Sequence, residues 1–584
     1  MENQGRDSSL RLASTAPRQL NRRQLLWLGA GIASSSLLAA CGGGAENTPG
    51  ADQPAATQTA AQGPQAQIAP TAVQQQTVTT GQSDARQGGT LIVAVGEEPQ
   101  SMDSYVASAP SSGMIYDNIF DELTMLEPDG TVVPRLAASW EVVEPTRWRF
   151  KLQENVTWHD GSPFTAEDVV YHFQRVFDPD KPGRPYGLTP GVDHAEAVDD
   201  TTVDVVTEVP IPTLANDLAP RWNVISSHRP SVEQWGDQYG DHPIGTGPFR
   251  FVEWKKGEEI VLEAFEDYWG GRPYLDRVII RFIPEDTTRL LALESGEVDY
   301  IYGLPRHEVA RLESSDQFKV LKSPNYVTMY LVFNASHQLL QDVRVRQALA
   351  YAIDKQEIVE VAFEGQAQVA EQLVAPGVAG YDASSETAWP YDPDQARALL
   401  SEAGWTDSDG DGILEKDGQK LSLEFSYSTG SRYPVEVSTV LQSQMREIGV
   451  DFQLREWENA ALLTEYPKGQ LACYAYGQGL GSGHFGQLAF NHFHSQGGRN
   501  YNFLYKIDAD TTARLDEILE ASVSEFDAEK RQDLWRQVMA INREQALMIP
   551  LYHPFELAAT SAKVMDAYVH PGEYLRLWRV WLQE

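Results

Sequence analysis

Residues 136–141 read LAASWE, and residues 158–170 read WHDGSPFTAEDVV. In the second stretch, Asp160 and Gly161 are followed by a Ser-Pro pair, which indicates a turn. Thr165 stands three residues before Asp168, a spacing close to the capping box that begins a helix. A helix is therefore expected over residues 166–176. His159 beside Asp160 could also be a catalytic pair, but a turn and a helix cap explain the same residues, and we interpret the stretch as structural.

Strand-like and helix-like patterns alternate on both sides of this stretch. Continuous or alternating apolar runs predict strands over residues 91–95, 141–143, 148–152, 202–207, 260–263, 278–283, 326–333, 422–427, 450–456 and 471–476. Helical spacing predicts helices over residues 166–176, 287–295, 343–361, 393–403, 434–448 and 528–546. Strands and helices mixed in this way are typical of the α/β class.

Length and charge limit the kinds of protein that this chain can be. It has 584 residues, 46 Lys and Arg against 83 Asp and Glu, and a formal net charge of −37. A single core rarely exceeds about 250–300 residues, so we expect two or three domains. The acidic excess argues against nucleic acid as a partner, because phosphate contacts need basic side chains. Two cysteines, Cys41 and Cys473, exclude a disulfide framework and a four-cysteine zinc site.

The first forty residues are typical of an export signal. Residues 1–40 carry five arginines and end in an apolar run over 25–40, which is shorter than the roughly 20 residues of a membrane span. Residues 38–42 read LAACG and resemble a bacterial lipobox, in which Cys41 would be lipidated. Arg22 and Arg23 resemble a twin-arginine export motif. Asn21 stands where Ser or Thr is usual, so general export remains the alternative.

Residues 41–86 form the next segment, rich in Gly, Ala, Pro, Gln and Thr. It has hardly any large apolar residues, so burial cannot offset the entropy of ordering it, and we expect a disordered tether. Such a tether has a reach of roughly 35–40 Å. The sequence thus predicts an exported globular body, anchored to the outer face of the cytoplasmic membrane through Cys41.

Four segments resemble the family-5 extracytoplasmic solute-binding proteins of bacterial ABC importers. The first is the pair of stretches at 136–141 and 158–170. The others are PIGTGPF at 243–249 with YWGG at 268–271, GEVD at 296–299, and DVRVRQAL at 342–349 with AIDK at 352–355. They occur in the family's order, and the resemblance extends from residue 88 to the end of the chain.

The resemblance implies a periplasmic-binding-protein-like fold of type II, cluster C. Two α/β lobes would close on a ligand in the cleft between them through a hinge. We expect lobe I over residues 87–328 together with 556–584, and lobe II over residues 329–555. The chain would cross between the lobes near 326–334 and return near 554–559.

The end of the strand over 471–476 is the expected ligand site in lobe II. Aromatic residues alternate there, and the glycines that follow expose backbone polar groups. The resemblance implies that this strand end lines the cleft, and that the loop after the first strand lines it from lobe I. The expected ligand-binding residues are Glu97, Glu98, Ser101, Tyr330, Tyr474, Tyr476, Gln478, Gly479, Gly481, Ser482 and His484.

The lack of charged residues after this strand indicates which groups of a ligand the site can bind. In peptide-binding members of the family, an aspartate after this strand pairs with the α-amino group of the peptide. Here residues 480–483 carry no charge, and a buried ammonium without a carboxylate costs several kcal/mol. We therefore expect binding that does not depend on a free α-amine, unless Glu97 or Glu98 supplies the anion. An oligopeptide held by its backbone or an oligosaccharide fits this expectation.

No cofactor is expected, and two metal patterns are incomplete. Asp407, Asp409 and Asp411 fall at positions 1, 3 and 5 of an EF-hand-like loop, but Gly418 stands at position 12, where a bidentate Glu is needed. An acidic turn is the preferred interpretation, with calcium as the alternative. His484, His492 and His494 have no Cys or carboxylate between them to complete a set.

The sequence contains none of the common hydrolase or nucleotide-binding motifs. We therefore expect a monomeric, non-catalytic protein that captures a solute and delivers it to an ABC permease in the membrane. A secreted, lipid-anchored hydrolase and a ligand-sensing receptor subunit are the alternatives.

Overall fold

The structure is a computed structural model that describes residues 86–106, 110–178, 183, 191–384, 389–430, 432–479 and 484–583. The expected export signal, Cys41 and nearly all of the tether lie outside these residues, as do Gly481 and Ser482. Twelve of the described strands form one large sheet, and a separate four-stranded sheet has the order β4-β5-β7-β6.

One end of the large sheet belongs to the expected lobe II. There β13 (Val327–Phe333) pairs with β19 (Cys473–Gly479), and β17 (Ser422–Tyr427) runs parallel to β18 (Asp451–Glu456) and to β19. All residues of β13 are buried because apolar clusters cover both faces of the strand. Met329 and Leu331 lie in one cluster, and Tyr330 and Val332 lie in the other. This alternation is the one expected for a central strand.

The other end of the large sheet contains β1 (Thr90–Val95), which runs parallel to β10 (Arg277–Phe282) and to β11 (Tyr300–Tyr302). Beyond β10 lie two antiparallel strands, β9 (Glu259–Ala264) and β8 (Phe249–Lys255).

The four-stranded sheet packs in an apolar core that is separate from those of the large sheet. Its strands are β4 (Ala137–Glu144), β5 (Arg147–Leu152), β6 (Val192–Asp199) and β7 (Thr202–Thr207), and α3 (Ala166–Val176) packs against β6 and β7.

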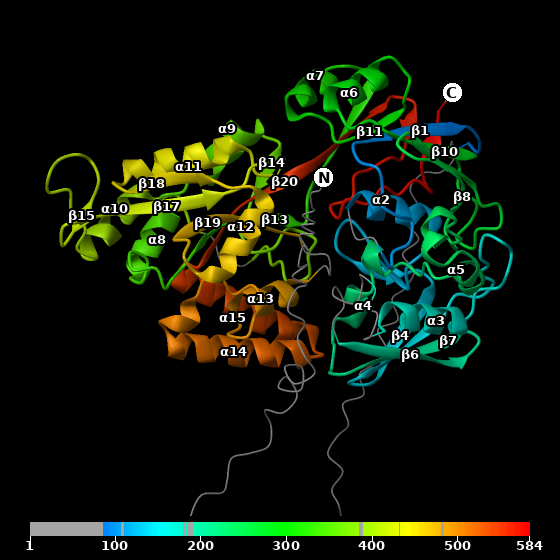
Figure 1. The fold of residues 1–584 in the computed structure, drawn as a ribbon, viewed down its shortest axis with the longest axis horizontal. Helices are drawn as coiled ribbons and strands as arrows, with labels where there is room; N and C mark the ends of the chain where they lie inside the picture. The colour runs from blue at the N-terminus through cyan, green and yellow to red at the C-terminus, as the bar shows by residue number, and fades with distance from the viewer. Residues whose placement is uncertain are drawn as a thin grey trace, which may run out of the picture. The chain divides into compact units, whose positions relative to one another are not determined.

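A single strand, β20 (Met548–Ser561), joins the two ends of the large sheet (Figure 1). Its first residues pair with β13, and its later residues pair with β11 and with β12 (Phe318–Pro324). The segment that follows β20 packs into the same cluster as β1, and its first strand, β21 (Val564–Met565), pairs with its last, β22 (Trp581–Leu582). A return of the chain near 554–559 is therefore made inside one long strand.

Residues 158–176 have the predicted turn and helix. The α3 helix spans the predicted residues, and the Asp168 carboxylate accepts a hydrogen bond of 2.8 Å from the Thr165 backbone N–H. His159 is buried between backbone groups, with Nδ1 accepting from Gly245 N–H and Nε2 donating to the Gly247 carbonyl. Burial lowers the pKa of His159 to about 4. A structural role for His159 is confirmed.

One predicted helix was wrong in its length. The helix expected over 343–361 is two helices, α8 (Val343–Tyr351) and α9 (Lys355–Phe363). The break occurs because the Asp354 carboxylate accepts hydrogen bonds from the N–H groups of Gln356 and Glu357, which begins a new helix. Four other predicted helices are confirmed with ends shifted by at most one residue: α6 (Asp286–Glu294), α10 (Pro393–Glu402), α11 (Val435–Glu447) and α15 (Ala528–Gln545).

The remaining helices were not predicted. They are α2 (Pro110–Ile119), α4 (Leu214–Asp217), α5 (Arg229–Trp235), α7 (Val309–Glu313), α12 (Asn459–Glu465), α13 (Phe485–Phe493) and α14 (Ala509–Ser524). Five further strands are short: β2 (Thr124–Leu126), β3 (Val132–Pro134), β14 (Ala367–Val369) and the paired β15 (Glu415–Lys416) and β16 (Gln419–Lys420). No helix of the described residues combines the length and apolar character of a membrane span.

Candidate ligand-binding site

The parallel strands β17 and β19 end at the same edge of the sheet, and the candidate site lies at that edge. Ligands of open α/β sheets bind outside the carboxyl ends of the strands. The β17 strand continues into a turn closed by hydrogen bonds between Gly430 and Tyr433, which holds Arg432. The β19 strand ends at Gln478 and Gly479. The turn that holds Arg432 and the last residues of β19 thus lie at the same edge of the sheet.

Arg432 and Arg221 come from the parts of the chain expected to form lobe II and lobe I, and they converge on one carboxylate. The Arg432 guanidinium contacts Oε1 of Glu573, and Nη2 of Arg221 lies 3.3 Å from Oε2 of the same residue. Nη1 of Arg221 also donates to the Gly572 carbonyl at 2.7 Å. Glu573 has a φ of 65°, which is uncommon for a residue other than glycine. The chain therefore holds this carboxylate between two guanidinium groups in an uncommon backbone conformation.

The surroundings of Glu573 are polar and buried. Nδ2 of Asn325 donates to Glu573 Oε1 at 3.1 Å and also contacts Glu556, whose Oε2 accepts from the Tyr302 hydroxyl at 3.1 Å. Burial lowers the pKa of Arg221, and its Nε atom has no hydrogen-bond partner among the described residues. Burial raises the pKa of Tyr302. A buried guanidinium with a spare donor can bind a further acceptor.

Sequence reasoning missed Arg221, Arg432 and Glu573. A signal for Arg432 was available, because it lies in the glycine- and serine-rich turn STGSRYP directly after the strand predicted over 422–427. For Arg221 and Glu573 no local pattern exists, because the fold brings them together from positions 352 residues apart.

Tyr476 and Gln478 lie at the carboxyl end of β19, with a cation beside them. Nη1 of Arg499 donates to Gln478 Oε1 at 2.6 Å and to the Tyr476 hydroxyl oxygen at 3.3 Å, while Gln478 Nε2 donates to the Gly479 carbonyl at 2.8 Å. Arg499 is exposed. Tyr476 and Gln478 were expected at the site from the sequence, whereas Arg499 was not.

Tyr330 and Tyr474 lie beneath this edge, in the apolar core. The Tyr330 side chain is fully buried and donates to the Leu373 carbonyl at 2.6 Å. Tyr474 packs against Tyr466 with ring centroids 4.6 Å apart. Both side chains support the strand ends from below.

His484 makes a second contact between the parts of the chain expected to form the two lobes. Its Nε2 lies 2.8 Å from Oδ1 of Asp217, the last residue of α4, and its ring stacks on Trp535 of α15. Both members of the pair are buried. The imidazole is thus engaged with the other lobe in this structure.

The loop after β1, expected to line the site from lobe I, is held by its own chain. The Glu98 carboxylate accepts from Trp254 Nε1 at 2.8 Å and from Gly257 N–H at 2.9 Å, which ties it to the β8–β9 hairpin. The Ser101 carbonyl accepts from the Tyr116 hydroxyl at 3.1 Å. Of Glu97 and Glu98, the two acidic residues of this loop that were expected at the site, only Glu97 is exposed.

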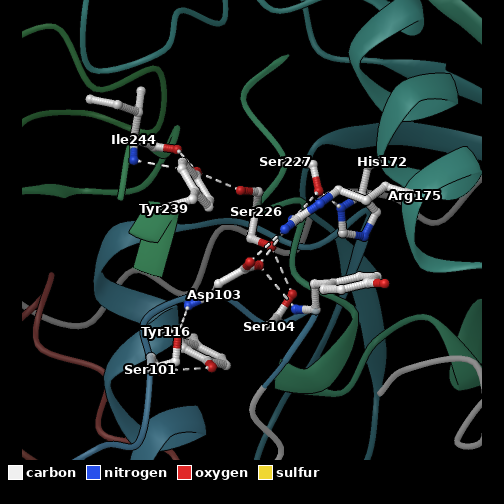
Figure 2. A network of polar contacts seen from close by, with 11 residues as sticks. Ser101, Asp103, Ser104, Tyr116, His172, Arg175, Ser226, Ser227, Tyr239 and Ile244 are labelled. Atoms are coloured by element: carbon white, nitrogen blue, oxygen red, sulfur yellow. Dashed lines mark hydrogen bonds and ion pairs between the residues drawn. The ribbon is translucent and has the colours of Figure 1, made fainter. Parts of the chain in front are cut away.

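A polar network fixes the continuation of this loop (Figure 2). Arg175 of α3 forms a 2.6 Å ion pair with Asp103, and Ser104 shares a 2.7 Å hydrogen bond with Ser226. The Asp103 side chain is 5% exposed and that of Arg175 16%. These contacts make the loop part of the lobe I core.

The same network contains a serine beside a histidine, which raises the question of catalysis. Nδ1 of His172 lies 3.0 Å from Ser227 Oγ (Figure 2). The nearby carboxylate of Asp103 pairs with Arg175, so it does not orient the imidazole, as the acid of a catalytic triad would. Burial lowers the pKa of His172 to about 3. Ser227 also accepts a hydrogen bond from Nη1 of Arg175, so the pair belongs to the network around Asp103.

The acidic turn brings together a different set of carboxylates from the one expected. Carboxylate oxygens of Asp407, Asp409 and Glu415 lie within 4.8 Å of one another, whereas Asp411 contacts Lys420. Asp407 accepts from the N–H groups of Gly410 and Gly412. These internal hydrogen bonds are those of an acidic turn.

The three clustered histidines do not form one site. His484 pairs with Asp217, and His492 is buried with its pKa lowered to about 3 by burial. His494 lies 3.5 Å from Glu520 and 3.8 Å from Asp516 on α14. Each imidazole has a separate environment.

Comparisons with known proteins agree with this architecture. The model of the bacterial extracellular solute-binding proteins, family 5, matches residues 131–500. The glutathione-binding protein GsiB of Pectobacterium atrosepticum is 32% identical over 391 residues, 67% of this chain and 71% of that protein. The nickel-binding periplasmic protein of Escherichia coli is 28% identical over 470 residues, 76% of this chain and 85% of that protein.

Solved structures give the same result. The oligopeptide-binding protein AppA of Bacillus subtilis, in complex with a nonapeptide, superposes with a TM-score of 0.65 at 26% identity and covers 86% of this chain and all of that one. HbpA2 of Haemophilus parasuis has a TM-score of 0.75 over 85% of this chain and all of its own, and at 24% identity it supports the type II fold alone. The chain belongs to the family-5 extracellular solute-binding proteins, the substrate-binding components of ABC importers.

Proposed function

We propose that the chain captures a small, peptide-like solute through a carboxylate of that solute, and delivers it to an ABC permease. The convergence of Arg432 and Arg221 on Glu573 carries this proposal. Guanidinium groups bind carboxylates bidentately, and two of them from opposite lobes bind best when the lobes are closed. On this proposal, the Glu573 carboxylate lies where the carboxylate of the solute would bind.

The relatives support a solute of this class. One is named for binding glutathione, and another was solved with a nonapeptide. Both ligands carry carboxylates. The contact set that we propose combines Arg221 and Arg432 with Tyr476, Gln478 and Gly479, and with Gly481 and Ser482 of the neighbouring loop.

The anchoring of the protein rests on its sequence. We propose export by the signal over residues 1–40, lipidation of Cys41, and a tether over 41–86 that holds a monomer near the membrane. We also propose lobe I over 87–328 with 556–584 and lobe II over 329–555. The division of the apolar clusters along the chain supports these boundaries.

We propose that the protein is not an enzyme. Among the residues drawn in Figure 2, Ser227 and His172 are the pair that resembles a nucleophile and base, and Ser227 is already hydrogen-bonded to Arg175. A hydrolase needs an accessible nucleophile with an oriented base.

Titration calorimetry with short peptides tests the solute class. Peptides with a free C-terminus are expected to bind, and C-terminal amidation is expected to weaken them by a hundredfold, about 2.7 kcal/mol. Equal affinity of a peptide and its amide would contradict the proposal. Mass spectrometry of the solute that co-purifies with the protein provides an independent check.

A further inference from the structure

Arg499 lies at the carboxyl end of β19, in the loop that follows α13. Its backbone N–H donates to the Asn491 carbonyl at 3.0 Å, which fixes the base of the side chain. The guanidinium reaches Gln478 and the Tyr476 hydroxyl through the single nitrogen Nη1. A guanidinium has five N–H donors, so most of its donor capacity remains for another acceptor.

The charge of Arg499 is not neutralised by the described residues. No carboxylate oxygen among them lies within 4.0 Å of its side-chain nitrogens. The imidazole of His492, packed against Tyr476, is held neutral by burial. Residues 480–483, which follow β19, are Leu, Gly, Ser and Gly. By contrast, Arg455 of β18 pairs with Glu424 at 3.1 Å.

We propose that Arg499 recognises an anionic group of the solute, so that the solute presents a carboxylate to the end of β19. This inference rests on the proposed function, in which Arg432 and Arg221 hold a different carboxylate of the same solute. Because β17 and β19 are adjacent and parallel, the two subsites lie side by side along one edge. The solute class is therefore a small dicarboxylate, such as a short acidic peptide.

The charges at this edge explain why the solute group bound there is an anion and not a cation. A cation beside neutral residues repels an ammonium group and attracts an anion, and a charge-assisted hydrogen bond is roughly twice as strong as a neutral one. Arg499 would act as a specificity-determining residue, and Gln478 and Tyr476 would position its guanidinium.

The test is calorimetric titration of the full chain with a matched pair of dipeptides, L-aspartyl-L-alanine and L-asparaginyl-L-alanine. Both carry the C-terminal carboxylate, and they differ in the second one. We expect the wild type to bind the aspartyl peptide at least tenfold more tightly. Arg499→Gln should remove this preference, and Arg499→Lys should keep part of it. Arg514→Gln, which removes an exposed arginine of α14, is the matched control and should change neither affinity.

The outcomes separate this inference from the proposed function. Equal binding of the two dipeptides by the wild type, or an unchanged preference in Arg499→Gln, would overturn the role of Arg499 and leave the first carboxylate subsite standing. Both proposals are supported if Arg432→Gln loses affinity for both dipeptides and Arg499→Gln alone loses the preference for the aspartyl peptide. Failure of the wild type to bind either dipeptide would overturn both.

Discussion

The loop after β1, on the one hand, and the turn after β17 with the end of β19, on the other, lie at the carboxyl ends of parallel strands at two different places in the large sheet. They differ in how their polar groups are satisfied. In the first, Glu98, Ser101 and Asp103 bond to their own lobe. In the second, Arg432 contacts the carboxylate of Glu573, and Arg499, from the loop that follows α13, is exposed beside the end of β19. A strand end that is saturated by its own chain is a support, whereas one with spare charge is available to a ligand.

The largest expected effect is on stability, at the supporting loop. Asp103→Ala should lower the free energy of unfolding by about 3–5 kcal/mol, because it leaves the guanidinium of Arg175 partly buried without its carboxylate. Urea denaturation measures this loss. The control is Arg455→Gln, which breaks the exposed pair with Glu424 and should cost about 0–1 kcal/mol. Similar losses in both variants would contradict the distinction between the two regions.

Acid should destabilise the protein through His172, which belongs to the polar network around Asp103. The folded-state pKa of His172 is lowered to about 3, below the ordinary value near 6.5, so the unfolded chain binds the proton more readily. The contribution of neutral His172 to the free energy of unfolding is therefore fully present above pH 6.5. It falls by about 1.4 kcal/mol per pH unit as the pH drops toward 3. In urea denaturation at pH 6.5 and 5.5, His172→Gln should show a shallower pH dependence than the wild type. An unchanged slope would show that His172 is not the group that titrates.

At the ligand edge, a substitution should change affinity more than stability. Arg432→Gln should weaken a peptide with a free C-terminus by at least tenfold, about 1.4 kcal/mol. The Arg432 side chain is 42% exposed, so the fold loses little when it is replaced. Calorimetry and a thermal melt of the same preparation measure the two quantities. A large drop in melting temperature with unchanged affinity would place Arg432 among the supporting residues.

The sequence predicted the fold better than the site for a physical reason. Helix caps and strands are local, so Thr165 with Asp168 located α3, and apolar alternation located β13 and β17. The break between α8 and α9 was missed because apolar spacing continues through it, although Asp354 is a capping residue. Arg221 and Glu573 meet only in the folded chain. Whether Glu98 faces a ligand or a hairpin depends on how β8 and β9 pack, which no local pattern contains.

The smallest expected effect concerns Glu97, the exposed acid of the supporting loop. If the solute is recognised through its carboxylates, Glu97→Gln should change peptide affinity by less than about threefold, or roughly 0.6 kcal/mol. N-acetylation of the peptide should have an equally small effect, because residues 480–483 provide no anion for an α-ammonium group. The measurement is titration of one peptide and its acetylated form into the wild type and the variant. A hundredfold loss on acetylation that disappears in Glu97→Gln would mean that lobe I supplies the missing anion. The loop after β1 would then be a ligand-binding element and not a support, and the contrast between the two strand ends would fail.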